Sequence, residues 1–473
     1  MPDSQRLTRK KQWHYIVLVN HEEGKPVKKS NMIKSATSIT LLAALALTGC
    51  SATSTSNTSV ASAISTSASS SSGTKSKTAD SFSTDVKNGA KLAEDTHYSA
   101  KDLTWDSSSE VTIDLSNPTA TDGVTVSDGV ITITKAGNYR LSGTYAGQIK
   151  VETADSDMVR LILDNATITN STGAAINVVK ADEVVIYTAS GTANTVSDGS
   201  SYSDTASGSP DAAIYSKSDL TLAGEGTLKV EGKYEEGIHT TDGLVIASGT
   251  LEVTAANTGI KGKDYVDILD GTTSVTATKD GIKATNDTDG NRGQAPAGGG
   301  AGGGMGGGGT FEVVDATINI AGGTVTVNAN GDGIDSNGTA TLSGGTLIVN
   351  GPFTGGNTSL DTNGDLLLNG TTVVAGNSGD MFEAPATSST SGYVKLTNLS
   401  NVSNGTTIQV ADSSGTVVAN YKVVNSNTSL ILVSSSKITK GESYTVYTTT
   451  DSVNASSTSV ASNATSLGSF TAS

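Results

Sequence analysis

A short motif recurs at a fixed interval through the middle of this chain: a polar or turn residue, then Gly, Ile and a second polar residue. Ile238, Ile260 and Ile282 stand 22 positions apart, and the next copy centres on Ile334, 52 positions further on. An insertion that contains a glycine-rich run accounts for the longer step. A period of this length without helical patterning is typical of a β-solenoid, in which each repeat forms one coil stacked on the last.

Composition supports an all-β chain. Aromatic residues make up only 4% of the sequence, and no segment beyond the N-terminal leader shows apolar residues at helical spacing. Short alternating apolar runs with Gly-containing corners fit three strands per coil, with coils about 4.8 Å apart. The sequence therefore predicts a right-handed parallel β-helix with coils of about 22 residues over residues 111–390, interrupted by the glycine-rich insertion at 290–309.

The 22-residue period ends near Ser391. Alternating runs such as Tyr393-Val-Lys-Leu then indicate antiparallel strands. We expect residues 391–473 to form a β-rich cap, because an uncapped solenoid exposes a strand edge, and to end in a loose tail from Ser452. Residues 81–110 are expected to lead into the first coil.

The single cysteine, Cys50, follows a positively charged flank, a short apolar run and Leu47-Thr-Gly. This order is typical of a secretory signal and resembles the bacterial lipobox, whose cysteine is lipidated. The sequence predicts a leader over residues 1–49, with translation starting at Met32 or an unusually long leader. Residues 50–80 are then a lipid anchor and a flexible Ser/Thr-rich linker. The expected location is the cell membrane, facing outward.

The charge of the chain excludes some partners. The first 49 residues hold eight basic and three acidic residues, a net charge of +5, so the remainder of this −16 chain carries −21. Such an acidic surface argues against nucleic acid and against direct docking on anionic lipid. An acidic polysaccharide would be repelled unless cations bridge the two. We expect a monomer.

Several stretches, in their order, resemble the bacterial family of carbohydrate-binding domain-containing lipoproteins. They are the run from Ile131 to Gly143, the Gly-Ile repeats, Asn330-Gly-Asp-Gly-Ile-Asp335 and the glycine-rich insertion. Members of this family are secreted or lipid-anchored right-handed parallel β-helices, related in shape to calcium-dependent pectate lyases. The resemblance implies binding of a plant-type or acidic polysaccharide, such as a polygalacturonate-like polymer, and bound calcium.

The polar residue after each motif Ile should stack in a ladder along one face. In chain order these residues are His239, Lys261, Lys283 and Asp335, with Asp361 next. Like charges one strand spacing apart repel, which favours a trough that binds a ligand; the alternative is that they are solvated turn residues. No tryptophan platform exists on the solenoid, so tyrosines would have to supply ring contacts. The predicted ligand-binding residues are Lys261, Lys283, His239, Tyr234 and Tyr265.

Acidic and amide side chains gather at neighbouring corners. Calcium takes six to eight oxygen ligands, which Asp and Asn at alternating positions can supply. The predicted metal ligands are Asp332, Asp335 and Asp361, with Asp280, Asp287 and Asn330 as further members. The alternative is that these residues simply favour turns.

Three classes of function remain open: a polysaccharide-binding protein, a calcium-dependent lyase and a structural stalk or adhesin. A lyase of this shape would use Lys283 or Lys261 as its base, yet a lysine base needs a lowered pKa and acidic neighbours raise it. No Ser-His-Asp set or pair of metal-ligating histidines is visible. The sequence therefore favours a binding protein and predicts no catalytic residue.

Overall fold

The computed structural model describes residues 92–473, apart from residues 95, 154–155, 157, 287–311, 354–355, 379–380, 398, 400–401 and 425–427. The predicted leader, Cys50 and the linker, the first part of the predicted lead-in (residues 81–91), Asp287 and the glycine-rich insertion lie outside the described residues. Within the described part, no helix is long and apolar enough to cross a membrane.

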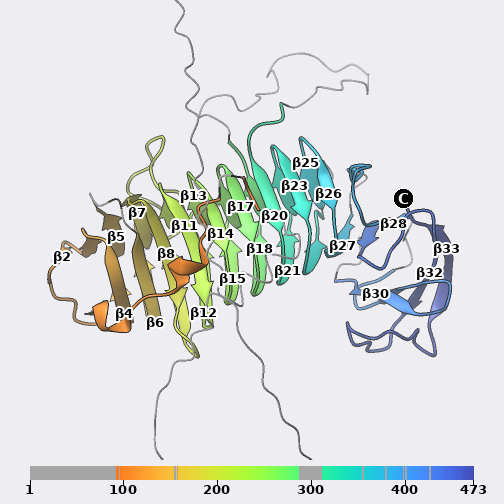
Figure 1. Cartoon of the computed structure of the whole chain (residues 1–473), viewed down its shortest axis with the longest axis horizontal. Helices are drawn as coiled ribbons and strands as arrows, with labels where there is room; N and C mark the ends of the chain where they lie inside the picture. The colour runs from red at the N-terminus through yellow and green to blue at the C-terminus, as the bar shows by residue number, and fades with distance from the viewer. Residues whose placement is uncertain are drawn as a thin grey trace, which may run out of the picture. The chain divides into compact units, whose positions relative to one another are not determined.

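The described chain winds into a parallel β-helix with three strand ladders (Figure 1). The first ladder contains β8 (Glu183–Thr188), β11 (Asp219–Gly224), β14 (Leu244–Ile246), β17 (Tyr265–Ile268), β20 (Thr317–Ile320), β23 (Thr339–Leu342) and β26 (Leu366–Leu368). The second ladder contains β9 (Ala193–Asp198), β12 (Thr227–Gly232), β15 (Thr250–Ala255), β18 (Thr272–Ala277), β21 (Thr324–Ala329), β24 (Thr346–Asn350) and β27 (Thr372–Asn377). Two long strands, β4 (Gly137–Ala146) and β6 (Val159–Asn170), extend across both ladders.

The third ladder carries the Gly-Ile motifs. Its parallel strands are β3 (Val130–Ile133), β5 (Gln148–Glu152), β7 (Ile176–Lys180), β10 (Ala212–Ser216), β13 (Glu236–Thr240), β16 (Ile260–Gly262), β19 (Ile282–Ala284), β22 (Ile334–Ser336) and β25 (Leu360–Thr362). At the first coil, β2 (Val124–Ser127) pairs antiparallel with β3. The predicted parallel β-helix is confirmed.

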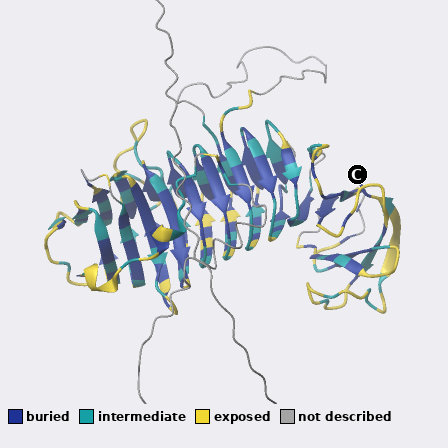
Figure 2. Ribbon diagram, viewed as in Figure 1, coloured by how far each residue is buried: buried dark blue, intermediate teal, exposed yellow. Residues whose placement is uncertain are grey.

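The motif isoleucines form a continuous inner column. Ile238 pairs with Ile260, Ile260 with Ile282, and Ile282 with Ile334, and all four side chains are fully buried. Full burial of such a side chain contributes about 1.5–3 kcal/mol relative to its exposure to water. Figure 2 shows buried residues, in dark blue, in the strands along the length of the solenoid. The hydrophobic period read from the sequence is therefore the period of the core.

The C-terminal part closes the end of the solenoid with antiparallel strands. The strands are β28 (Tyr393–Thr397), β29 (Thr407–Ala411), β30 (Val417–Lys422), β31 (Leu430–Ser434), β32 (Ser443–Thr449) and β33 (Thr465–Thr471). Strand β31 pairs antiparallel with β27 and with β28, so the last coil of the second ladder does not end in an open edge. Within the tail that the sequence analysis expects to be loose, β33 pairs antiparallel with β32 over most of its length, so this part of the tail belongs to the cap.

The lead-in packs across the first ladder. It includes two short 3-10 helices, η1 (Ala100–Leu103) and η2 (Ser107–Ser109), and then β1 (Glu110–Asp114), which pairs parallel with β4. The backbone N–H of Ala93 lies 3.3 Å from a carboxylate oxygen of Asp267 on β17. Arg160 of β6 donates to the carbonyl of Asp102 at 2.7 Å. These contacts cover part of the first ladder.

Candidate functional site along the third ladder

The predicted polar ladder exists. On the third ladder Tyr215 pairs with His239, His239 with Lys261, Lys261 with Lys283, Lys283 with Asp335, and Asp335 with Asp361. These residues occupy the same strand position in successive coils, so they form one column whose members are spaced by about 4.8 Å. The column changes from aromatic and basic residues to acidic ones along the chain.

Asp280, Asp332 and Asp335 gather beside the acidic part of this column, and we call them the Asp332 cluster. One carboxylate oxygen of each lies within 4.8 Å of the others. Local backbone contacts hold two of them: Asp332 N–H donates to Asp280 Oδ1 at 3.1 Å, and Thr358 N–H donates to Asp332 Oδ1 at 2.6 Å. In both cases the side chain of the first motif residue accepts a hydrogen bond from the backbone of the next coil.

Lys283 neutralises part of the Asp332 cluster. Its ammonium group forms ion pairs with Asp335 and, at 3.3 Å, with Asp280. Burial alone would lower the pKa of Lys283, but the charges and hydrogen bonds of the two aspartates outweigh it and raise the pKa. Burial raises the pKa of Asp332 to about 7, and the neighbouring carboxylates add to this effect. The pKa of Asp335 rises to about 6 through burial, although Lys283 opposes the rise.

Asp361, a further predicted metal ligand, is not one of the three grouped carboxyl groups. Asp361 follows Asp335 in the column, but its carboxyl group shares a hydrogen bond with Glu383 instead. Burial raises the pKa of Glu383 to about 7, and Asp361 contributes to the rise. Asn330 is exposed, and Asp287 lies outside the described residues. Glu383 was missed because it comes from a segment beyond the repeats.

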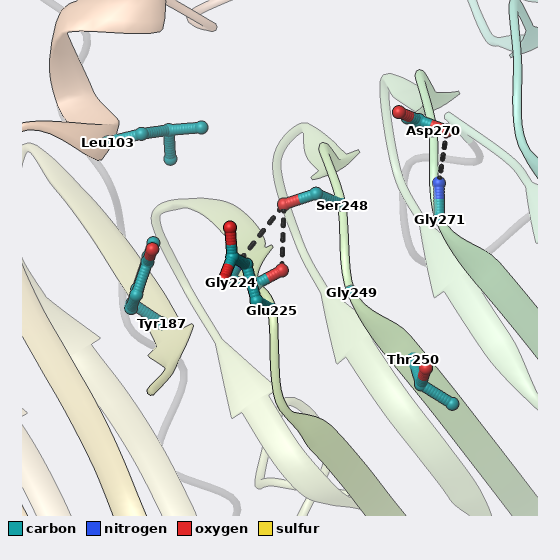
Figure 3. A pocket seen from close by; sticks show the side chains of 9 residues that line it. All are labelled: Leu103, Tyr187, Gly224, Glu225, Ser248, Gly249, Thr250, Asp270 and Gly271. Atoms are coloured by element: carbon teal, nitrogen blue, oxygen red, sulfur yellow. Dashed lines mark hydrogen bonds between the residues drawn. The ribbon is translucent and has the colours of Figure 1, made fainter. Parts of the chain in front are cut away.

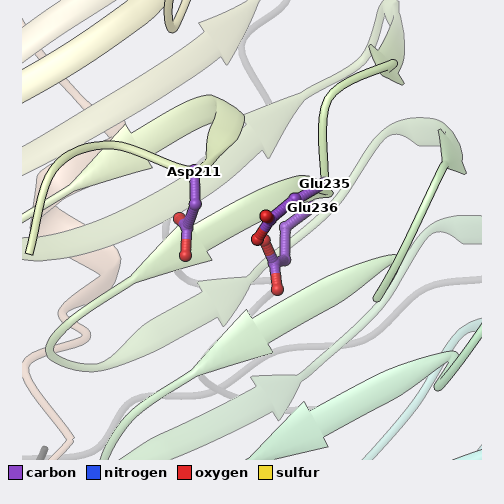
Figure 4. Close-up of side chains that lie close together, drawn as sticks. All are labelled: Asp211, Glu235 and Glu236. Atoms are coloured by element: carbon purple, nitrogen blue, oxygen red, sulfur yellow. The ribbon is translucent and has the colours of Figure 1, made fainter. Parts of the chain in front are cut away.

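A second acidic group, which the sequence analysis missed, lies at the other end of the column. It consists of Asp211, Glu235 and Glu236, which we call the Glu236 cluster (Figure 4). One carboxylate oxygen of each lies within 4.8 Å of the others. The side chain of Glu236 is only 4% exposed, and its Oε2 is buried without a hydrogen-bond partner among the described residues. Burial, with the charge of Asp211, raises the pKa of Glu236 to about 8.

Two predicted ligand-binding residues lie near the Glu236 cluster. His239 is buried, with its Nδ1 atom 2.5 Å from Asp211 Oδ1. Tyr234 is half-buried and stacks on Tyr202, with ring centroids 4.2 Å apart and planes inclined by 16°. Lys261 is half-buried in the same column and has no ion pair or side-chain hydrogen bond with the described residues.

Tyr265 does not belong to this face, which corrects the sequence prediction. It lies on β17 of the first ladder, is 2% exposed, and accepts a hydrogen bond from the backbone N–H of His97 at 2.9 Å. The lead-in covers it. No local pattern around Tyr265 could have indicated this cover, because the covering residues lie far away in the sequence.

A shallow pocket of about 290 Å³ lies at the corner between the first and second ladders (Figure 3). Its lining includes Leu103 of the lead-in, Tyr187, Glu225 and Asp270. Ser248 occupies its wall and is hydrogen-bonded to both the N–H and the carbonyl of Gly224, at 3.0 and 3.1 Å. None of the predicted site residues lines this pocket.

Part of this chain is similar to known proteins. Residues 127–302 match the family model of the carbohydrate-binding domain-containing proteins. A protein with the same description from Acetivibrio thermocellus is 37% identical over 145 residues, which cover 30% of this chain and 51% of the relative. The chain therefore spans about half the length of the curated relative it matches.

A solved structure, that of a polysaccharide lyase-like protein from C. thermocellum in a gadolinium derivative, is also similar. It is 31% identical, with a TM-score of 0.46, and the match covers 55% of this chain and 95% of the solved one. The resemblance to the carbohydrate-binding domain-containing proteins that the sequence predicts is thus confirmed, with the family model matching residues 127–302.

Proposed function

We propose that this chain binds polysaccharide through the outer face of the third ladder, without cleaving it. The observation that carries the proposal is the in-register column of His239, Lys261 and Lys283, which lies inside the segment that matches the carbohydrate-binding family model. A linear polymer that follows the solenoid axis meets the same strand position in coil after coil. Repeated weak contacts along one ligand add up to useful affinity.

The finer proposal is that the polymer carries uronic acids. Lys261 supports it, because its ammonium group has no ion-pair partner within the described part of the chain and is free to meet a carboxylate. The stacked pair of Tyr202 and Tyr234 offers an aromatic surface of the kind that packs against sugar rings. The acidic remainder of the chain opposes such a ligand, so the attraction must come from local contacts.

Calcium was predicted for the acidic end of the column, and the Asp332 cluster fits it poorly. The Lys283 ammonium group already pairs with two of its three carboxylates. The backbone of the following coil engages Asp280 and Asp332 as well. A calcium ion at this cluster would have to displace the Lys283 ammonium group. We therefore assign no calcium to it.

The lyase alternative requires a lysine that loses its proton near neutrality. Asp335 and Asp280 raise the pKa of Lys283 and so keep it protonated, which makes it a poor general base. Lys261 is the remaining lysine of the column to test. The geometry thus favours binding over cleavage.

Affinity electrophoresis tests this function. The protein is run through gels that contain polygalacturonate, a neutral glucan or no polysaccharide, and ultraviolet absorbance of unsaturated products is followed in parallel. We expect retardation by polygalacturonate without product absorbance, and we expect Lys261→Ala to lose most of it. The matched control is Lys422→Ala, an exposed lysine on β30 of the cap, which should be retarded like the wild type.

Each other outcome favours a different function. Product absorbance that disappears in Lys261→Ala or Lys283→Ala would establish the lyase. Retardation by the neutral glucan alone would remove the uronic-acid proposal and keep polysaccharide binding. No retardation in any gel would leave the structural stalk or adhesin.

We also propose that Cys50 anchors the protein to the outer side of the cell membrane. The support is the lipobox-like Leu47-Thr-Gly-Cys50 sequence. Cys50→Ala should abolish labelling by a radioactive fatty acid and release the protein from the membrane fraction, whereas Cys50→Ala protein that stays in the membrane would contradict the anchor.

A further inference from the structure

The Glu236 cluster brings three carboxyl groups together from two neighbouring coils. Asp211 immediately precedes β10, while Glu235 and Glu236 stand at the start of β13, the next strand of the third ladder. The backbone N–H of Glu236 donates to the carbonyl of Asp211 at 3.0 Å, so the two coils are tied together at this point. The pairing of β10 with β13 therefore places the three residues on adjacent strands, and Figure 4 shows their side chains close together.

The environment of Glu236 indicates that, among the described residues, this cluster lacks a hydrogen-bonding or positively charged partner for one of its oxygens. A buried carboxylate oxygen without a hydrogen bond costs free energy, because it has lost water and gained nothing in exchange. Glu236 Oε2 is in this state, on a side chain that is 96% buried. The carboxyl group points toward two further acids, which makes the local repulsion larger rather than smaller.

No charged neighbour in the described part of the chain forms an ion pair with Glu236 itself. His239 contacts Asp211, and Lys261 influences Glu236 only through its charge, without a direct ion pair in the described part of the chain. Tyr202 uses its hydroxyl group on Asp198 and on the carbonyl of Ala212. By contrast, the Asp332 cluster holds the ammonium group of Lys283.

We propose that Asp211, Glu235 and Glu236 bind a divalent cation of the calcium class. Oxygen is the only donor type among the three, which favours calcium or magnesium over zinc. Calcium tolerates irregular geometry and takes six to eight oxygens, so the remaining positions fall to water, to main-chain carbonyls or to a ligand. The cation supplies the missing partner of Glu236 Oε2. The proposal places the metal on other coils than the sequence predicted and does not depend on carbohydrate binding.

Calorimetric titration of the chelator-treated whole protein with calcium alone tests the proposal. Wild type should bind calcium, and Glu235→Gln combined with Glu236→Gln should abolish this binding. Asp332→Asn, the matched change in the other cluster, should keep it. Absence of binding in wild type, wild-type binding in the double variant, or loss of binding in Asp332→Asn alone would each overturn the assignment.

Thermal denaturation supplies a second readout that separates lost binding from lost folding. In chelator, the double variant should melt at or above the wild-type temperature, because its two amides remove the repulsion among the three carboxyl groups. In excess calcium, wild type should gain stability and the double variant should not, so the order of the two melting temperatures should reverse. If the double variant does not fold, Glu235→Gln alone, a change at a half-buried side chain, should weaken calcium binding by about tenfold or more, and unchanged affinity would contradict the site.

Discussion

The glycine of each Gly-Ile motif is required by the close approach of neighbouring strands. A Cβ atom on Gly259 would lie 2.2 Å from Val275 Cγ1 on β18 and 2.7 Å from the carbonyl oxygen of Gly281 in the next coil. Gly237, Gly281 and Gly333 meet the same kind of neighbours. Packing therefore explains the motif. The isoleucine fills the core, and the glycine leaves room for a valine of the second ladder.

Gly259→Ala should destabilise the protein by about 1–3 kcal/mol, because the added methyl group overlaps a packed side chain and a backbone carbonyl. Urea denaturation measures the effect. Gly173→Ala is the matched control, because the nearest atom to its added Cβ would be Asn170 Nδ2 at an ordinary 3.4 Å. Equal midpoints for the two variants would show that the solenoid relaxes around the methyl group.

At the scale of single residues, the sequence predicted the column but not its partners. The spacing of the motif isoleucines was enough to align His239, Lys261, Lys283 and Asp335, because strand position determines register. It could not reveal that Lys283 lies between two aspartates. Asp211 was missed because its coil reads Asp-Ala-Ala-Ile-Tyr, without the glycine that marks the other copies.

At the scale of elements, the lead-in holds a group of titratable side chains against the first ladder. His97 Nδ1 lies 3.0 Å from Asp219 and its Nε2 lies 3.5 Å from Glu183. Burial raises the pKa of Glu183 to about 7. Burial alone would lower the pKa of His97, but the hydrogen bond and charge of Asp219, with other carboxylates, raise it. Both shifts favour the protonated forms in the folded protein.

These shifts predict that the free energy of unfolding falls as pH rises from about 5 to 8. Folded Glu183 keeps its proton up to about pH 7, whereas the unfolded side chain loses it near 4.5. The contribution of charged His97 is fully present below pH 6.5 and is lost as pH rises through its raised pKa. The titration of Glu183 accounts for a loss of roughly 1–3 kcal/mol across this window, and the titration of His97 adds to it in the same direction.

Urea denaturation at several pH values measures this dependence. Glu183→Gln should flatten part of the slope between pH 5 and 8, because its amide does not titrate. Glu252→Gln, at an exposed position of β15, should leave the slope unchanged. A slope that is the same in wild type and Glu183→Gln would mean that Glu183 is not neutral in the folded protein near pH 6.

No pattern in the sequence indicated these lead-in contacts. His97 and Tyr265 are 168 positions apart, and Ala93 and Asp267 are 174 apart. Periodicity reports contacts between neighbouring coils, whereas the lead-in crosses several coils and follows no repeat. The buried polar residues of the first ladder therefore looked like ordinary solvent-facing positions.

At the scale of the whole described unit, the antiparallel cap protects the end of the solenoid. Strand β31 pairs with the backbone groups at the outer edge of β27, with Val374 opposite Val433. Val374 is buried against the cap rather than in the bore of the solenoid. Without the cap, β27 would present unpaired backbone groups and an apolar side chain, which is a template for association with another chain.

Truncation after residue 390 should therefore make the protein self-associate. Light scattering during size-exclusion chromatography measures the effect. Adding Val374→Lys to the truncated chain should reduce the association, because a lysine on an exposed edge opposes pairing. A truncated protein that stays a monodisperse monomer would mean that β27 needs no cover.

The order of side chains in the third-ladder column gives the binding face a sense of direction. From Tyr215 through Lys261 to Asp361 the side chains change from aromatic to basic to acidic, so the column differs when it is read in the opposite direction. Sugar chains likewise have distinct reducing and non-reducing ends. A chain laid along this face would therefore be held in one orientation, so that oligosaccharides labelled at opposite ends would place their labels at opposite ends of the solenoid.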